Sequence, residues 1–300
     1  MSAVPGPASA GGAWPELPYD SWRDSKSTLH MFTQVLGKLR LGLAPHEPEW
    51  MHVPLYVTAS GLTTEPMPYR DRVIQADLDL IDHRCILRDG DGTVLGFPLP
   101  GRSVAEFYAG VLGGLRSLGA EVEINPKPQE VPDPVPFPED GRRDYDPQWV
   151  RRFHRTLTSV NQVFTRFRAG YRGRHSRVQF FWGSFDLNYV RFSGRAIDPP
   201  PDAGVISREG MDAEQFAIGF WPGDHRYPAP AFFSYAYPPP DGIQDTVLRP
   251  AGAAWHEMGE FLLPYDAIRG LDDPAQGLLD FLDCTCQAAL NLAGWRQYQP

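Results

Sequence analysis

Apolar residues recur at two different spacings along the chain, and these spacings separate predicted helices from predicted strands. Over residues 25–43 the apolar positions repeat every three or four residues, which is typical of an amphipathic helix, with Ser25 or Ser27 as its N-cap. The same spacing predicts three further helices, over residues 103–118, 147–171 and 273–293. Alternating apolar and polar positions predict strands over residues 51–58, 73–87, 93–99, 121–125, 215–221, 231–237 and 260–263.

One aromatic and polar stretch, residues 177–195 with the sequence RVQFFWGSFDLNYVRFSGR, stands out from the other predicted strands. Read as a strand, its even positions from Phe180 to Asn188 form one face, which begins aromatic and becomes polar, as the wall of a pocket does. A bulge at Gly183 would reverse the alternation and add Gln179 to the polar face. The alternative is an ordinary strand with one buried and one solvated face.

A weak internal repeat accompanies this pattern. Residues 34–40 and 162–168 share the order Gln, Val, apolar, any, basic, apolar, Arg, and each segment precedes a predicted strand. We therefore expect an α+β fold of two related α-β-β-β-α halves around mainly antiparallel sheet, in which His52 and Gln179 are equivalent. A chance match between two amphipathic helices is the alternative. The expected boundaries are a disordered tail over 1–13, a first half over 14–125, a proline-rich crossing over 126–147 and a second half over 148–300.

Composition and charge exclude several classes of function. The formal net charge of −9 disfavours nucleic-acid binding, and no apolar run approaches the length of a membrane span. The N-terminus lacks the features of a secretory signal, and three cysteines make a disulfide framework improbable, so we expect a cytoplasmic protein. Metal-ligand spacings, a nucleophile elbow, phosphate loops and dinucleotide fingerprints are absent, and no metal and no cofactor is predicted.

The aromatic and polar stretch supplies most of the candidate site residues. Asp186 is the first candidate for acid–base chemistry, because it lies among aromatic residues, and His52 on a facing strand is its candidate partner. Residues expected to orient polar groups of a substrate, or to form an apolar wall, are Gln34, Lys38, Gln179, Ser184, Arg191, Arg195, Trp182 and Trp221. Glu260 and Tyr265 are weaker candidates.

These residues favour an enzyme that acts on a small organic molecule in a cleft between the two halves. A non-catalytic protein that binds a small ligand in the same cleft is the first alternative. A structural ion pair between Asp186 and Arg191 would explain both residues without a ligand, and the aromatic surface could instead form a homodimer interface.

Several motifs cover nearly the whole chain from Trp14 to Trp295: TLHMFTQVLGKLRL, HVPLYVTASGLTT, VQFFWGSFDLNYVRFSGR, GFWPG and GEFLLPYD. In these motifs the chain resembles an uncharacterised bacterial family that carries a domain-of-unknown-function label. The resemblance implies that the chain is one complete unit and implies no activity, cofactor or catalytic residue. The family pattern has a His where this chain has Gln179, which puts a histidine-based role at that position in doubt here.

Overall fold

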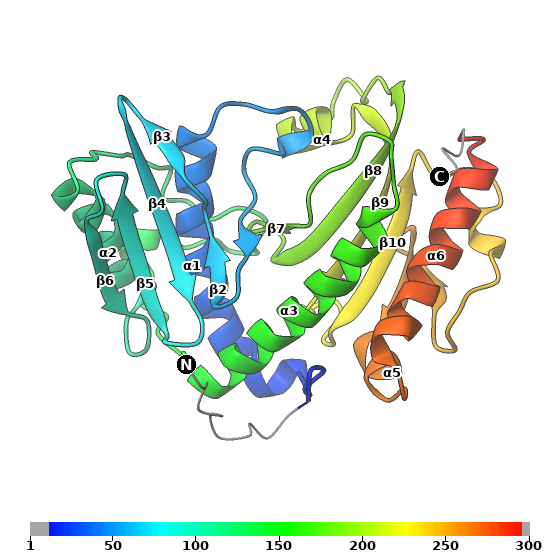
Figure 1. Cartoon of the computed structure of the whole chain (residues 1–300), viewed down its shortest axis with the longest axis horizontal. Coiled ribbons are helices and arrows are strands. Elements are labelled where there is room, and N and C mark those ends of the chain that lie inside the picture. The colour runs from blue at the N-terminus through cyan, green and yellow to red at the C-terminus, as the bar shows by residue number, and fades with distance from the viewer. Residues whose placement is uncertain (1–11, 296–300) are drawn as a thin grey trace, which may run out of the picture.

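A computed structural model describes residues 12–295, and most of the predicted 1–13 tail lies outside the described residues. The described chain forms helices and mainly antiparallel sheets, which confirms the α+β class (Figure 1). Two six-stranded antiparallel sheets, one in each half of the chain, lie on either side of the helices α1 (Tyr19–Leu43) and α3 (Pro147–Ala169).

The first sheet has the strand order β1-β2-β4-β5-β6, with β3 paired to β4. Its strands are β1 (Tyr56–Val57), β2 (Gly61–Thr63), β3 (Met67–Tyr69), β4 (Arg72–Asp79), β5 (Arg84–Asp89) and β6 (Val94–Pro98). A tight turn at residues 90–92 connects β5 to β6 as a hairpin. Helix α2 (Val104–Ser117) packs on this sheet and begins at Ser103, whose hydroxyl accepts the Glu106 N–H while the Glu106 carboxylate accepts the Ser103 N–H.

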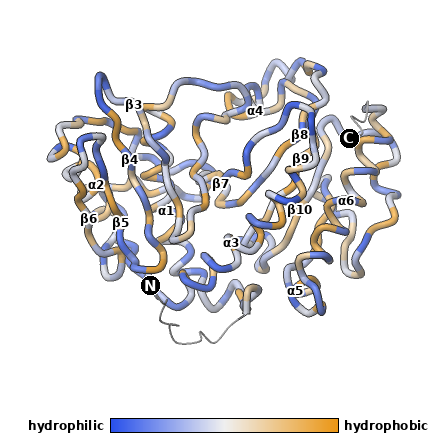
Figure 2. The backbone as a smooth tube through the Cα atoms, viewed as in Figure 1, coloured by the Kyte–Doolittle hydropathy of each residue, from blue (hydrophilic) through white to orange (hydrophobic). Residues whose placement is uncertain are grey.

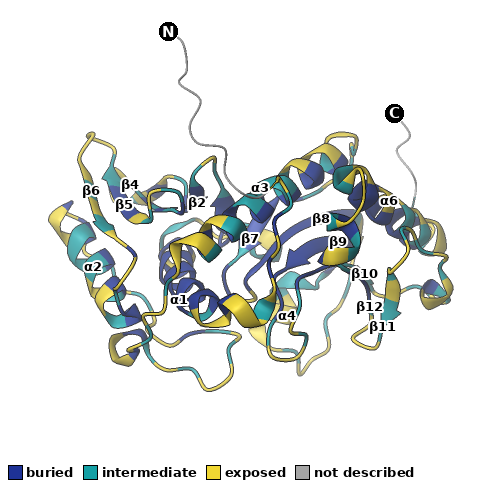
Figure 3. Cartoon of the chain, turned by 90° about the horizontal axis from the view of Figure 1, so that it is seen from below, coloured by how far each residue is buried: buried dark blue, intermediate teal, exposed yellow. Residues whose placement is uncertain are grey.

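The second sheet has the order β11-β12-β10-β9-β8-β7. Its strands are β7 (Gln179–Phe181), β8 (Asp186–Ala196), β9 (Ala213–Trp221), β10 (Ala231–Tyr237), β11 (Ala254–His256) and β12 (Glu260–Pro264). One face of it packs against α3 and α6 (Pro274–Leu292), as Figure 3 shows. The remaining short helices are η1 (Pro48–Trp50), η2 (Phe137–Glu139), α4 (Val205–Gly210), η3 (Ile243–Asp245) and α5 (Tyr265–Arg269).

Four predicted elements differ from the structure. Residues 73–87 form two strands joined by a turn at Leu80–His83, where His83 has a positive φ of 52°. The prediction of a single long strand over 73–87 was therefore wrong. Residues 121–125 form no strand, and only Tyr56–Val57 of the segment 51–58 does. Helix α1 begins at Tyr19 rather than at a serine cap, and Ser25 accepts a hydrogen bond from the Asp146 backbone N–H.

The stretch 177–195 is a hairpin rather than one strand. The Phe185 N–H donates to the Phe181 carbonyl, and Phe185 has a φ of +61°, so the chain reverses between β7 and β8. The reversal changes the alternation at Gly183, as the bulge alternative expected, although the cause is a turn. Gln179 and Phe181 therefore share the open face of the second sheet with Asp186 and Asn188.

The two halves meet where their first strand segments lie side by side. Leu55 and Phe180 exchange backbone hydrogen bonds of 2.9 and 2.8 Å, which joins the first half to β7. Both halves have the order helix, antiparallel strands, helix, but their strand orders differ, and the internal repeat stays a prediction.

The crossing over residues 126–147 is mostly irregular, as expected. It nevertheless contributes Phe137, which is fully buried, to the hydrophobic core. Hydrophilic segments of the tube in Figure 2 lie at exposed turns such as the one between β3 and β4. None of the helices formed by residues 12–295 combines the length and the apolar character needed to cross a bilayer.

Candidate functional site

A cavity of about 1090 Å³ lies between the open face of the second sheet and helix α1. The sheet contributes its floor, from β7 to β10 and from the start of β12, while α1, the crossing and the η1 and α4 segments contribute the walls. The cavity is therefore bounded by both halves of the chain, and its volume is close to the upper end of the range for small-molecule sites.

Strand alternation explains which side chains reach this cavity. On β8 the even residues Asp186, Asn188 and Val190 line it, whereas Leu187 and Tyr189 are buried in the hydrophobic core on the other side. The floor is continued by Trp221 at the end of β9 and by Phe233 and Tyr235 on β10. The open face is thus polar at the start of β8, at Asp186 and Asn188, and aromatic along β10.

Asp186 is the most deeply buried carboxyl group of the cavity, and 7% of the residue is exposed. The Ser184 hydroxyl donates a hydrogen bond to its Oδ1. Among residues 12–295, no Lys, Arg or His nitrogen lies within 4 Å of the carboxylate. Burial raises the pKa of Asp186 to about 7, Ser184 opposes this shift, and the nearby Glu130 and Glu260 carboxylates add to it.

Two further carboxyl groups line the same cavity. Burial raises the pKa of Glu260 to about 7, and desolvation of the carboxyl group also raises the pKa of Glu130, although the Glu130 residue as a whole is exposed. The Glu130 carboxylate lies against Gly183, where a Cβ would approach Oε1 to 2.1 Å. Within the described chain neither group forms an ion pair. Glu260 was a weak candidate from the sequence, whereas Glu130 had no sequence signal beyond its place in an irregular segment.

The α1 wall carries a stripe of polar residues at helical spacing: Tyr19, Arg23, Lys26, Ser27 and His30. Only 8% of Lys26 is exposed, and within residues 12–295 its ammonium has no hydrogen-bond or ion-pair partner. Its Nζ lies 5.3 Å from the Phe185 ring centroid. Burial lowers the pKa of Lys26 to about 8, opposed by the charge of Asp224.

His30 closes the inner end of this stripe. Its Nε2 lies 2.9 Å from the Trp182 carbonyl oxygen and 3.0 Å from that of Gly183, so Nε2 carries the proton and donates it. Burial, together with the charge of Lys26, lowers the pKa of His30 to about 3, and the ring is neutral. The stripe begins about four turns before the predicted Gln34 and about five turns before Lys38, and extending the helical spacing toward the N-terminus would have found it.

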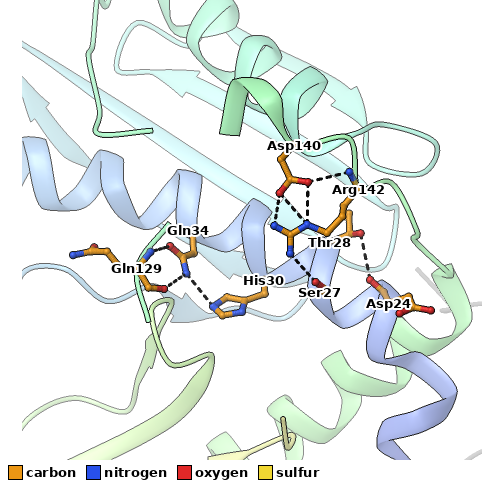
Figure 4. A network of polar contacts seen from close by, with 8 residues as sticks. All are labelled: Asp24, Ser27, Thr28, His30, Gln34, Gln129, Asp140 and Arg142. Carbon is orange, nitrogen blue, oxygen red and sulfur yellow. Dashed lines mark hydrogen bonds and ion pairs between the residues drawn. The ribbon is translucent and has the colours of Figure 1, made fainter. Parts of the chain in front are cut away.

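Figure 4 shows how α1 holds the crossing that carries Glu130. The Gln34 amide donates to the Gln129 carbonyl at 2.7 Å, and its Oε1 accepts the Gln129 N–H at 2.9 Å. Arg142 is paired with Asp140 and donates to the Ser27 hydroxyl at 2.9 Å. Gln34 therefore positions one wall of the cavity and does not itself line it.

The structure brings four of the ten predicted site residues into the cavity: Gln179, Ser184, Asp186 and Trp221. Gln179 donates from Nε2 to the Asn188 Oδ1 at 3.2 Å, so this pair presents amide groups to the cavity. His52 is not brought to Asp186. It lies outside the lining, with its ring stacked on Trp50 and its Nδ1 accepting the Glu47 N–H.

The remaining predicted residues have structural contacts away from the cavity. The Trp182 Nε1–H donates to the Val53 carbonyl at 3.0 Å, and the Lys38 ammonium lies over its ring. Arg191 donates to the Phe167 carbonyl at 2.9 Å on the opposite face of the sheet. Arg195 pairs with Glu214. Because none of these residues lines the cavity, we remove them from the candidate site.

The described residues contain no group of three or more His, Cys, Asp or Glu side chains arranged to hold a metal ion. Neither the curated proteins nor the solved structures include a match to the chain. Residues 14–299 match the model of a family of unknown function, DUF5996. Because this match covers nearly the whole sequence, the chain belongs to that family.

Proposed function

We propose that the protein is an enzyme that acts on a small organic molecule by acid–base chemistry, with Asp186 as the group that gives and accepts the proton. The observation that carries this proposal is the position of Asp186. Its carboxyl group is buried at the floor of a cavity, and no cation lies within ion-pair distance among the described residues. A structural carboxylate buried at such cost is normally paired.

The pKa values of the cavity support a proton-transfer role. A carboxyl group that titrates near neutral pH can act as either acid or base, and the pKa of Asp186 is raised to about 7. Glu260 replaces His52 as the proposed partner, because its pKa is also raised to about 7 and it belongs to the same cavity. Two carboxyl groups that repel each other's charge favour a state in which one is protonated and the other ionised.

The rest of the floor has separate roles in this proposal. Gln179 and Asn188 present amide groups that orient polar atoms of the substrate, and Ser184 holds the Asp186 carboxylate through its hydroxyl group. Trp221 and Phe233 form the apolar part of the floor. We retain the cytoplasm as the expected location of the protein.

The test is metabolite profiling with matched variants. Purified protein is incubated with a small-molecule extract, and mass spectrometry follows which compounds are consumed and which are formed. We expect the wild type to convert at least one compound. Asp186→Asn should lower the rate of this conversion at least a hundredfold. Glu214→Gln, a change on the same sheet away from the cavity, should retain the wild-type rate. Equal conversion by Asp186→Asn would reject the catalytic role. A co-purified ligand that is bound and never converted would favour the non-catalytic binding protein.

A further inference from the structure

The charged groups around the cavity divide into those that are paired within the protein and those that are not. Five lining groups form ion pairs: Arg23 with Asp24, Glu49 with Arg174, Arg142 with Asp140, and Asp224 and Arg226 with each other. On the sheet side, Asp186 and Glu260 form no ion pair within residues 12–295, and Glu130 beside them forms none either. On the α1 side the described group without an anionic partner is the Lys26 ammonium, which lies over the Tyr19 and Phe185 rings and whose residue is 8% exposed.

Aromatic rings border the sheet-side carboxyl groups. Trp221, Phe233 and Tyr235 line the cavity from β9 and β10, and the charges of Asp186 and Glu260 both act on the Tyr235 hydroxyl. An organic cation is attracted both by carboxylates and by the faces of aromatic rings. The aromatic border beside the carboxyl groups fits a cation whose charge is carried by an organic group, and the described residues contain no group of three His, Cys, Asp or Glu side chains arranged for a metal ion.

We propose that the ligand of this cavity is an amphoteric organic molecule, whose amine or guanidinium group lies between Asp186 and Glu260 and whose anionic group meets Lys26. This inference names the substrate class of the proposed enzyme and therefore rests on the proposed function. Buried charges without partners carry a desolvation free-energy cost. A ligand with both signs of charge offsets this cost at both walls, because it pairs with the carboxyl groups at one end and with Lys26 at the other. A ligand with one charge leaves the other wall unpaired.

The probes are ω-amino acids with three to seven methylene groups, from 4-aminobutanoate to 8-aminooctanoate, each compared with the alkylamine and the alkanoate of the same length. Calorimetry or protein NMR gives the dissociation constants at pH 7.5. We expect one ω-amino acid to bind at least tenfold more tightly than both of its single-charge analogues. Equal affinity for the three compounds at every length would overturn the proposal, and this comparison needs no variant.

Variants then assign each end of the ligand. Lys26→Met should weaken the best ω-amino acid at least tenfold and leave the alkylamine unchanged, while Glu260→Gln should weaken the alkylamine at least tenfold and leave the alkanoate unchanged. Lys38→Met is the matched control, because Lys38 is another buried lysine of α1, 3% exposed, outside the cavity lining. If Lys38→Met lowers the affinity for the ω-amino acid as much as Lys26→Met does, the assignment of the anionic end to Lys26 is overturned. Lys26→Gln, checked by circular dichroism, replaces Lys26→Met if the latter fails to fold.

Failure of this inference can be separated from failure of the proposed function. If Asp186→Asn loses metabolite conversion but the wild type binds the probes without regard to their charge, the amphoteric ligand is rejected and the proposed enzymatic function stands. If the protein binds the probes in a charge-dependent way but converts no metabolite, the proposed enzymatic function is rejected and the amphoteric ligand class stands.

Discussion

Asp186 and Arg191, five positions apart on β8, project from opposite faces of the second sheet. The Asp186 carboxyl lines the cavity, whereas the Arg191 guanidinium donates to the Phe167 carbonyl and lies 4.0 Å from the Phe167 ring centroid. An odd separation along a strand places two side chains on opposite faces, so these residues cannot form the structural ion pair that was the alternative explanation for both. The negative charge of Asp186 is therefore left for the cavity.

The stability of Asp186→Asn should depend on pH in a way that identifies this unpaired charge. The pKa of Asp186 is raised from 3.8 to about 7, so the folded state holds the proton more tightly than the unfolded state, and wild-type stability falls as pH rises from about 4 to 7. The variant has no carboxyl group at this position, so its stability does not show this decrease with rising pH. We expect it to be more stable than wild type at pH 8 by at most about 4 kcal/mol, from about 1.4 kcal/mol per pKa unit, and equal to wild type below pH 4.

Urea unfolding at pH 4, 6 and 8 measures this difference, with Glu214→Gln as the control for a carboxyl-to-amide change on the same sheet. A variant that is less stable than wild type at pH 8 would show that the carboxylate makes a favourable contact in the folded protein, against this account.

The three lysines of the sequence, Lys26, Lys38 and Lys127, allow access to the cavity to be measured chemically. Burial lowers the pKa of both Lys26 and Lys38 to about 8, but only Lys26 lines the cavity, and Lys127 is exposed. At pH 8 an ordinary lysine is under about 1% neutral amine, whereas one with a pKa near 8 is about half neutral.

Reductive methylation at pH 8, followed by peptide mass spectrometry, should therefore modify Lys26 fastest and Lys38 slowest. The Lys26 rate should level off above pH 8, because its amine is then mostly neutral. Modification of Lys26 as slow as that of Lys38 would mean that the cavity does not give access to the amine.

Gly219→Ala should fill part of the cavity floor. A Cβ at Gly219 would lie 2.0 Å from the Phe233 Cζ, so the Phe233 ring must move toward the cavity. We expect at least a tenfold loss of probe binding and a destabilisation of about 1 to 3 kcal/mol, as is usual when a packed site is overfilled. Gly113→Ala on α2 is the control, because nothing lies within 4 Å of that position and alanine favours helix. Unchanged probe binding in Gly219→Ala would place the ligand away from Phe233.

Gln34→Leu should loosen the segment that carries Glu130. The change removes both hydrogen bonds to the Gln129 backbone, with an expected cost of about 2 kcal/mol. Hydrogen exchange followed by mass spectrometry should show faster exchange over residues 128–132 and no change over α2. Slow exchange at 128–132 in this variant would mean that Gln34 does not position the segment.

Periodicity predicted much of the fold and part of the site. The helices over 103–118, 147–171 and 273–293 and the strands over 215–221 and 231–237 follow spacings that local sequence carries. Asp186, Ser184, Gln179 and Trp221 were found because an aromatic strand with polar positions is an unusual pattern for a core.

The missed residues depend on long-range packing. Lys26 and His30 line the cavity only because α1 crosses the open face of the second sheet, and Glu130 belongs to an irregular segment held by Gln34. His52 and Trp182 were misplaced for a related reason: local alternation does not tell which neighbour a residue meets, and both meet backbone groups of the first half.

The most direct test of the account is the titration of Asp186 itself. Carbon-13 NMR of the side-chain carboxyl resonances, with the Asp186 signal identified by its loss in Asp186→Asn, measures the pKa in the intact protein. We predict a midpoint near pH 7, and a lower midpoint in Glu260→Gln, because that change removes a neighbouring negative charge. A midpoint below about pH 4.5, close to that of an ordinary aspartate, would contradict it.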